Sequence, residues 1–184
     1  MNPSSPNGNN GWYVSNVAIT LNANDNISGV NITKYKIDDG NWKKYTKPIK
    51  IINNGEHTIK YYSIDNAGNE EGMKTVEIKI DKVKPNVSIK NPDNGVYVFG
   101  RKIFPWLSII IIGKITIEVI ANDSYSGISH VEFYIDGVKK CNVSNEPYEY
   151  LWNERAFFRH RIKVIAYDKA GNMAKDEIEV KKFF

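Results

Sequence analysis

Four aspartates in two repeated loop motifs could together bind a cation. Asp25 and Asp123 each occupy the motif Ala-Asn-Asp-x-x-Ser-Gly. Asp65 and Asp168 each begin the motif Asp-x-Ala-Gly-Asn. In a β-sandwich the two loops of one copy would reach the same pole, so Asp25 should approach Asp65. By the same reasoning Asp123 should approach Asp168.

Two carboxylates held close together repel each other unless a hard cation with oxygen ligands, such as Ca²⁺, neutralises them. The alternative is that each aspartate caps its own turn by accepting backbone N–H bonds. Neither loop has the dense acidic spacing of a dedicated calcium site. The sequence therefore favours turn capping and predicts no obligatory cofactor, with Ca²⁺ as the one candidate.

Aromatic side chains form the second group that could bind a ligand. Trp12, Tyr13, Trp42 and Tyr45 are candidates for a flat platform on which a sugar ring stacks. The alternative, which we favour, is that Trp42 and Tyr45 are cross-strand neighbours that cover a sheet. The segment 155–161 interleaves aromatic and basic residues and could stack bases or sugars, but it is typical of a hairpin rich in long side chains. We predict no nucleic-acid partner.

Five Asn-x-Ser/Thr sequons are candidates for glycosylation at a cell surface. Loops rich in asparagine also produce such triplets by chance, so the motif alone leaves occupancy open. The asparagines are Asn26, Asn31, Asn86, Asn122 and Asn142.

No arrangement of residues predicts catalysis. His57 and His160 occupy equivalent positions of a repeat, which indicates scaffolding rather than general-base chemistry. His130 has no equivalent, and the residues around Cys141 match no nucleophile motif. Phosphate-binding loops and zinc-ligand spacings are also missing from the sequence. We therefore predict a protein that is not an enzyme.

The elements that position these residues are repeated along the chain. Residues 57–69 return as residues 160–172 with about half of the positions identical, and residues 17–30 align with residues 115–128 at the same order and spacing. A period near 100 residues is that of a whole domain. We expect a linker over 1–10, one module over 11–82 and a second over 83–184.

Each module has the pattern of an all-β domain. Apolar residues alternate with polar ones from Val17 to Ala23 and from Ile59 to Ser63, which predicts strands with one buried face. Asp39-Gly40 is typical of a type I′ hairpin turn. The apolar run 103–113 contains Pro105 and is too short to span a membrane, so it predicts a buried strand. Aromatic residues make up 12% of the 184 residues, which is ample for two cores without a disulfide.

In the order Ala-x-Asp-x-x-Ser-Gly, Ile-Asp-Gly and Asp-x-Ala-Gly-Asn, the motifs resemble bacterial and archaeal immunoglobulin-like repeats of secreted and surface-layer-associated proteins. The resemblance extends over residues 11–181, where the motifs occur once in each module, and it implies two immunoglobulin-like (fibronectin III-like) β-sandwiches in tandem. It implies a non-catalytic spacer, stalk or adhesion module at the cell surface, joined to other domains of a larger protein and in contact with surface glycans or proteins. The alternative is a pair of carbohydrate-binding accessory modules of a secreted hydrolase.

Overall fold

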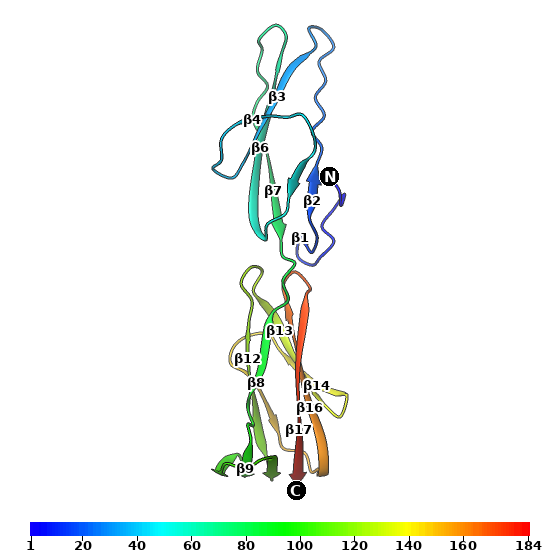
Figure 1. Ribbon diagram of the computed structural model, residues 1–184. Coiled ribbons are helices and arrows are strands. Elements are labelled where there is room, and N and C mark those ends of the chain that lie inside the picture. Colours follow the sequence, from blue (N-terminus) through cyan, green and yellow to red (C-terminus); the bar gives the residue numbers. More distant parts are fainter. The chain divides into compact units, whose positions relative to one another are not determined.

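A computed structural model describes residues 1–184, and every regular element in it is a β-strand (Figure 1). The chain divides into two compact units, residues 1–82 and residues 83–184. Residues 1–10 belong to the first unit and are not a free linker, which corrects the expectation from composition. The backbone of Asn2 exchanges two hydrogen bonds with Ala18, and the side chain of Asn7 accepts a hydrogen bond from the Val14 N–H. Backbone and side-chain hydrogen bonds of these asparagines thus hold the segment against the first unit.

The first unit is a sandwich of a five-stranded and a two-stranded sheet. The larger sheet has the order β1-β7-β6-β3-β4, and the smaller one pairs β2 with β5. Its core lies between the sheets and consists of one tyrosine, one valine and six isoleucines. The strands are β1 (Trp12–Tyr13), β2 (Val17–Ile19), β3 (Val30–Ile37), β4 (Lys43–Lys44), β5 (Ile49–Ile51), β6 (Gly55–Asp65) and β7 (Lys74–Ile80).

The second unit pairs a seven-stranded sheet, ordered β10-β9-β11-β17-β16-β13-β14, with a three-stranded sheet, ordered β15-β12-β8. Phe133 and Trp152 are the largest side chains buried between them. The strands are β8 (Asn86–Asn91), β9 (Gly95–Val98), β10 (Arg101–Phe104), β11 (Ile109–Ile112), β12 (Ile115–Asn122), β13 (Ile128–Ile135), β14 (Val138–Val143), β15 (Tyr148–Trp152), β16 (Phe157–Asp168) and β17 (Met173–Phe183).

The alternation of apolar residues located the strands but overestimated two of them. In the first unit β2 ends at Ile19, because β5, the only strand that pairs with it, offers three residues for pairing. Its equivalent β12 is eight residues long and has partners on both edges, β15 and β8. The run 103–113 is not one buried strand: β10 ends at Phe104 with exposed side chains, and only Ile109 and Ile111 of β11 are buried. No helix in the chain is long and apolar enough to cross a membrane.

The hairpin between β3 and β4 differs from the expected Asp39-Gly40 turn. Gly40 donates its N–H to the carbonyl oxygen of Ile37, so the central residues are Asp38 and Asp39. Asp38 has a φ of 51°, and Asp136 has the same φ at the equivalent turn of the second unit. The left-handed residue is therefore an aspartate in both units, for a reason that the side-chain contacts below explain.

In both units the last strand lies parallel to an earlier one. β7 pairs with β1, with Trp12 opposite Lys79 and Tyr13 opposite Ile80. β17 pairs with β11 over four residue pairs, and β11 also pairs in parallel with β9. We call these pairings, β1–β7 and β11–β17, the terminal ladders.

Candidate functional sites

The aspartate loops of the second unit come together as the sequence predicted. β12 leads into Asp123 and β16 ends at Asp168, and carboxylate oxygens of the two lie within 4.8 Å of each other. Asp123 Oδ1 accepts the N–H groups of Tyr125 and Gly127 at 3.0 and 2.9 Å. Asp168 Oδ1 accepts N–H bonds from Gly171 and Asn172 at 2.7 and 2.8 Å. Both aspartates therefore cap their own turns.

The Oδ2 atom of Asp123 is the exception in this arrangement. It is buried and accepts no hydrogen bond. A buried carboxylate oxygen without a donor, close to a second carboxylate, is costly unless a positive charge compensates for it. The turn geometry thus accounts for three of the four carboxylate oxygens of the pair and leaves one place where a cation would be favourable.

In the first unit the equivalent pair is open to solvent. Asp25 Oδ1 accepts N–H bonds from Gly29, Ile27 and Ser28, and these three donors lower the pKa of its carboxyl group. The pKa of Asp65 is lowered chiefly by the side-chain amide of Asn69. Both carboxylates are therefore stabilised by local donors, and neither has an unsatisfied buried oxygen.

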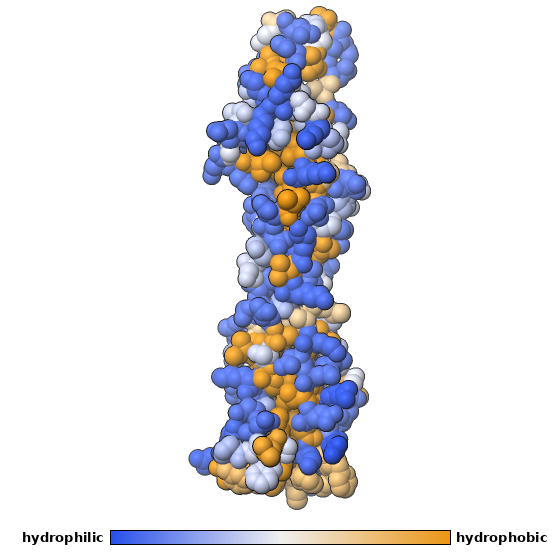
Figure 2. All heavy atoms as spheres, in the orientation of Figure 1, coloured by the Kyte–Doolittle hydropathy of each residue, from blue (hydrophilic) through white to orange (hydrophobic).

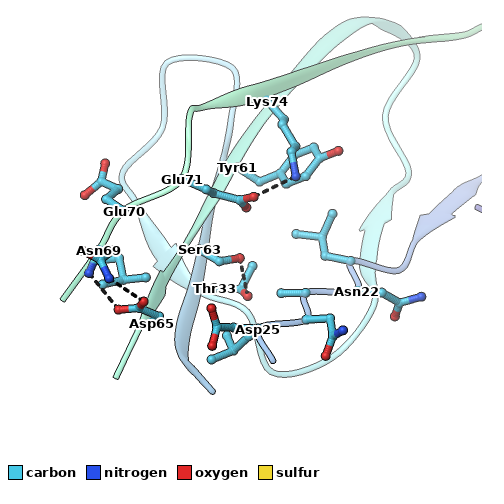
Figure 3. Close-up of a pocket in the computed structure, with 15 residues that line it drawn as sticks. Asn22, Asp25, Thr33, Tyr61, Ser63, Asp65, Asn69, Glu70, Glu71 and Lys74 are labelled. Carbon is cyan, nitrogen blue, oxygen red and sulfur yellow. Dashed lines mark hydrogen bonds and ion pairs between the residues drawn. The ribbon is translucent and has the colours of Figure 1, made fainter. Parts of the chain in front are cut away.

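A polar pocket of about 320 Å³ lies beside this pair in the first unit (Figure 3). The hydroxyl groups of Thr33 and Ser63 face each other at 3.0 Å on neighbouring strands β3 and β6. On one side Lys74 Nζ donates to Glu71 Oε2 at 2.8 Å, next to the ring of Tyr61. That contact lowers the pKa of Glu71 and raises the pKa of Lys74. The pocket thus presents hydroxyl groups, one ion pair and one aromatic ring.

The aromatic platform that the sequence suggested does not form. Trp12 and Tyr13, on β1, are only 8% and 3% exposed, so their ring faces cannot stack on a sugar. Tyr45 packs edge-on against Tyr35, 6.3 Å between ring centroids, at the margin of the core. Trp42 alone is exposed, and it packs edge-on against Tyr62 with a centroid distance of 4.8 Å. These aromatic residues stabilise the sheet, as the alternative interpretation held.

The repeated histidines lie in a structural contact that the sequence analysis did not identify. His57 Nδ1 lies 3.0 Å from Asp38 Oδ2, and its Nε2 lies 3.2 Å from the carbonyl oxygen of Asn53. The other carboxylate oxygen of Asp38 accepts the N–H of Thr58 at 2.8 Å. We call this arrangement, a histidine between a turn aspartate and a backbone carbonyl, the His–Asp clamp.

The second unit contains the same clamp. His160 Nδ1 lies 2.6 Å from Asp136 Oδ2, and its Nε2 lies 3.1 Å from the carbonyl oxygen of Phe157. Asp136 Oδ1 accepts the N–H of Arg161. The clamp explains why an aspartate takes the left-handed position of each turn. The sequence did contain a signal for the clamp. His57 and His160 are repeated, and so are the turn aspartates, Asp38 and Asp136, that they contact.

The two remaining nucleophile or base candidates, His130 and Cys141, have different surroundings. His130 stacks on Tyr167 with a centroid distance of 4.7 Å and an interplanar angle of 11°. Cys141 is half-buried on β14, and burial raises the pKa of its thiol, which disfavours the reactive thiolate.

All five sequon asparagines have exposed side chains. Asn86 and Asn122 are Cα partners on β8 and β12, and the amide of Asn86 donates to Asn122 Oδ1 at 3.3 Å. Two glycans at these positions would occupy the same space.

A family comparison identifies the type of the second unit. Residues 85–164 match the family model described as a bacterial Ig domain. The match and the two-sheet topology show that this unit is an immunoglobulin-like sandwich, and the internal repeat gives the first unit the same type of fold. No curated protein matches the chain at a significant level.

Solved structures with similar folds have low identity to the chain. Fibronectin(III)-like modules of CbhA from Clostridium thermocellum are 24% identical, with 91% of this chain and 85% of that one covered at a TM-score of 0.45. The D00-D0 domain of intimin is 12% identical, with 96% and 97% covered at 0.44. A Bacteroides ovatus protein, SGBP-B of a mixed-linkage glucan utilization locus solved with a heptasaccharide, is 13% identical, with 91% and 41% covered at 0.30. All three TM-scores are below 0.5, so these likenesses do not indicate a ligand for this chain.

Proposed function

We propose that this chain is a load-bearing spacer of a larger secreted or cell-surface protein. Immunoglobulin-like modules are generally non-catalytic and typically extracellular, and residues 85–164 match one. The finer assignment, a stalk that resists tension, rests on the terminal ladders. Adhesion to surface glycans or proteins would then depend on other domains of the parent protein.

The single observation that carries this proposal is the parallel pairing of the last strand in each unit. When the two ends of a unit are pulled apart, parallel strands are drawn in opposite directions along their own axes. All hydrogen bonds of the ladder are then stretched together rather than one after another. β1 and β7, the first and last strands, have this relation in the first unit. In the second unit β17, the last strand, is parallel to β11, while β8, the first strand, pairs with β12 in the other sheet.

The groups that could have carried chemistry support the same proposal. The repeated aspartates accept backbone N–H bonds in their own loops, and the repeated histidines are held in His–Asp clamps. These contacts fix turns and hairpins. Their repetition in both units fits a selection for stiffness rather than for turnover.

The test is to pull the full chain by its two ends in a single-molecule force experiment. At about 3.6 Å per residue, unfolding should release up to about 30 nm for residues 1–82 and about 37 nm for residues 83–184, in two separate steps. The shorter step should come at the lower force, because the β1–β7 ladder has two residue pairs and the β11–β17 ladder has four.

A change in pulling direction provides the control. In a Cys141→Ser/Arg155→Cys variant, force applied between residue 155 and the C-terminus peels β17 from β16 one hydrogen bond at a time, because Phe157 and Phe183 are partners at the same end of the two strands. The second unit should then open at a several-fold lower force than when it is pulled end to end. Equal forces in the two directions would contradict a load-bearing role.

A second candidate function, carbohydrate binding by an accessory module, is favoured by the polar pocket of the first unit. Sugar hydroxyls could exchange hydrogen bonds with Thr33, Ser63 and the Glu71–Lys74 pair. A glycan array with the full chain should give hits that a Lys74→Ala variant loses and a Lys43→Ala variant keeps. An array without hits would remove this candidate and leave the spacer proposal untouched.

A further inference from the structure

One end of the second unit exposes a cluster of aromatic side chains. Five of the seven phenylalanines of the protein lie there, together with Ile112, and all six side chains are exposed. In Figure 2 orange and pale orange spheres gather at the end of the second unit that carries the C-terminus. We call this cluster the phenylalanine pole. It consists of Phe99, Ile112, Phe157, Phe158, Phe183 and Phe184.

Sheet register makes the phenylalanine pole a contiguous surface. Ile112 is the Cα partner of Phe183 across the β11–β17 ladder, and Phe183 is the partner of Phe157 across β16. Phe99 donates its N–H to the Ile112 carbonyl oxygen at 2.8 Å. The ring of Phe99 lies so close over Gly113 that a Cβ there would be 2.7 Å from it. The strands β9, β11 and β17 all end at this pole.

Three members of the pole have backbone conformations that are costly for a bulky residue. Phe158 has a φ of 77°, Phe99 a φ of 47° and Phe184 a φ of 84°. In the internal repeat Phe158 aligns with Gly55, which has a φ of 122°. The first unit thus uses glycine where the second has a phenylalanine that is 73% exposed. Phe158 makes no buried contact within the chain that would offset its backbone strain. We therefore look for a binding partner outside the chain that contacts this side chain.

The charges around the phenylalanine pole are of one sign. In the segments 99–102, 112–114, 155–159 and 181–184, every charged side chain is basic. The nearest carboxylate in sequence, Glu154, is ion-paired with Lys140 at 2.6 Å. The exposed basic side chains without an ion pair of their own are Arg101, Lys114, Arg155, Arg159 and Lys181. Lys102 is ion-paired with Asp93 at 2.6 Å, and Lys182 is buried.

We propose that the phenylalanine pole inserts into the surface of a lipid bilayer that carries anionic headgroups. Six apolar side chains without a polar group gain free energy only where water is removed from them, and the boundary between headgroups and hydrocarbon provides that. The surrounding basic side chains would at the same time lie among anionic headgroups. Phenylalanine inside and lysine or arginine outside is the composition of side-chain anchors at membrane surfaces. This inference does not depend on the load-bearing role.

The test is co-sedimentation of the full chain with vesicles of phosphatidylcholine alone and of an equal mixture with phosphatidylglycerol. Binding should be stronger to the mixture. A Phe99→Asn/Phe158→Gly variant should bind roughly tenfold more weakly, because it removes two inserted rings. Asparagine and glycine tolerate a positive φ, so this variant should keep its fold, which its melting temperature would verify.

Two further variants complete the design. Ile27→Asn removes an equally exposed apolar side chain from a loop of the first unit and should leave vesicle binding unchanged. Arg101→Glu/Lys114→Glu should remove the preference for phosphatidylglycerol.

Three results would overturn the proposal. The first is absence of binding to both vesicle types, or equal binding by the Phe99→Asn/Phe158→Gly variant. The second is self-association that this variant abolishes while vesicles are not bound, which would make the pole an interface between copies of the chain. The third is binding of a single-stranded oligonucleotide in place of vesicles, with the same dependence on the two phenylalanines.

Discussion

Both ring nitrogens of His57 and His160 face oxygen acceptors, a carboxylate on one side and a backbone carbonyl on the other. The clamp therefore joins the imidazole ring to a carboxylate and fixes the turn to the neighbouring strand, β6 in the first unit and β16 in the second. It makes the histidines structural in both units.

Removal of the clamp should destabilise the second unit. We expect His160→Ala to lower its free energy of unfolding by about 1–2 kcal/mol, since the contact is half exposed and partly screened. A double-mutant cycle with Asp136→Ala, measured by urea unfolding, should give a coupling energy above about 0.5 kcal/mol. Strictly additive losses would show that the two side chains do not act together.

The lowered pKa values of the Asp25 and Asp65 carboxyl groups predict how the stability of the first unit changes at acid pH. Backbone N–H donors, that of Gly29 first, hold the pKa of Asp25 below its ordinary value of 3.8, and Asn69 does the same for the pKa of Asp65. A group whose pKa is lower in the folded state stabilises the fold above its unfolded value and loses that contribution as pH falls through its folded value. The urea concentration at the midpoint of unfolding should thus decrease as the pH is lowered below about 4. In the Asp25→Asn variant this decrease should be shallower. An unchanged acid slope in this variant would contradict the assignment.

The unsatisfied Oδ2 atom of Asp123 predicts a response to calcium. If a cation is held between Asp123 and Asp168, Ca²⁺ at about 100 times its dissociation constant should stabilise the second unit by about 2.7 kcal/mol. Asp123→Asn should abolish the shift in melting temperature between Ca²⁺ and chelator, while its Oδ1 still caps the turn. Asp25→Asn, at the solvent-exposed equivalent position, should not. Identical melts of the wild-type chain under both conditions would remove the cation.

At the scale of elements, periodicity was informative where a strand has one buried face. It located β12 and β16, in which every second residue is buried from Ile115 to Ala121 and from Ile162 to Asp168, and also β6, in which Ile59 is buried. It failed for residues 20–23, because alternation records a potential face but not whether a partner strand is present to pair with it. It also failed for residues 103–107, whose apolar character belongs to an exposed surface. The His–Asp clamp could not be derived because the contact spans 19 and 24 residues.

The equivalent positions 55 and 158, at the start of β6 and of β16, allow a test of backbone strain. Gly55→Ala should cost the first unit about 1 kcal/mol or more, since nothing crowds a Cβ there and only the φ of 122° opposes it. Phe158→Gly should leave the second unit's stability about unchanged, because relief of strain offsets the greater freedom of the unfolded chain. Chemical unfolding of both variants provides the measurement. A neutral Gly55→Ala change would show that this turn is not constrained.

At the scale of the whole molecule, each unit has a separate core. The buried cluster of the second unit contains sixteen residues and that of the first contains eight. The larger buried apolar surface should make the second unit the more stable of the two. The repeat in the sequence was sufficient to predict two such domains, whereas the difference in core size depends on which strands find partners.

Equilibrium unfolding in urea should therefore show two transitions. Ile59→Ala in the first core should lower the midpoint of the earlier transition only, and Phe133→Ala in the second core should lower that of the later one. Each substitution should reduce the free energy of unfolding of its unit by about 2–5 kcal/mol. Intrinsic fluorescence can follow both, since each unit contains two tryptophans. A single transition shifted by both substitutions would mean that the chain unfolds as one cooperative body.

The unequal lengths of the two terminal ladders have a consequence for whatever the chain is fixed to. When two units in series bear the same force, the unit with the shorter ladder unfolds first, and the length that it releases lowers the force on the other. The first unit would therefore unfold under a sudden pull, keep the second unit folded, and refold when the force is removed.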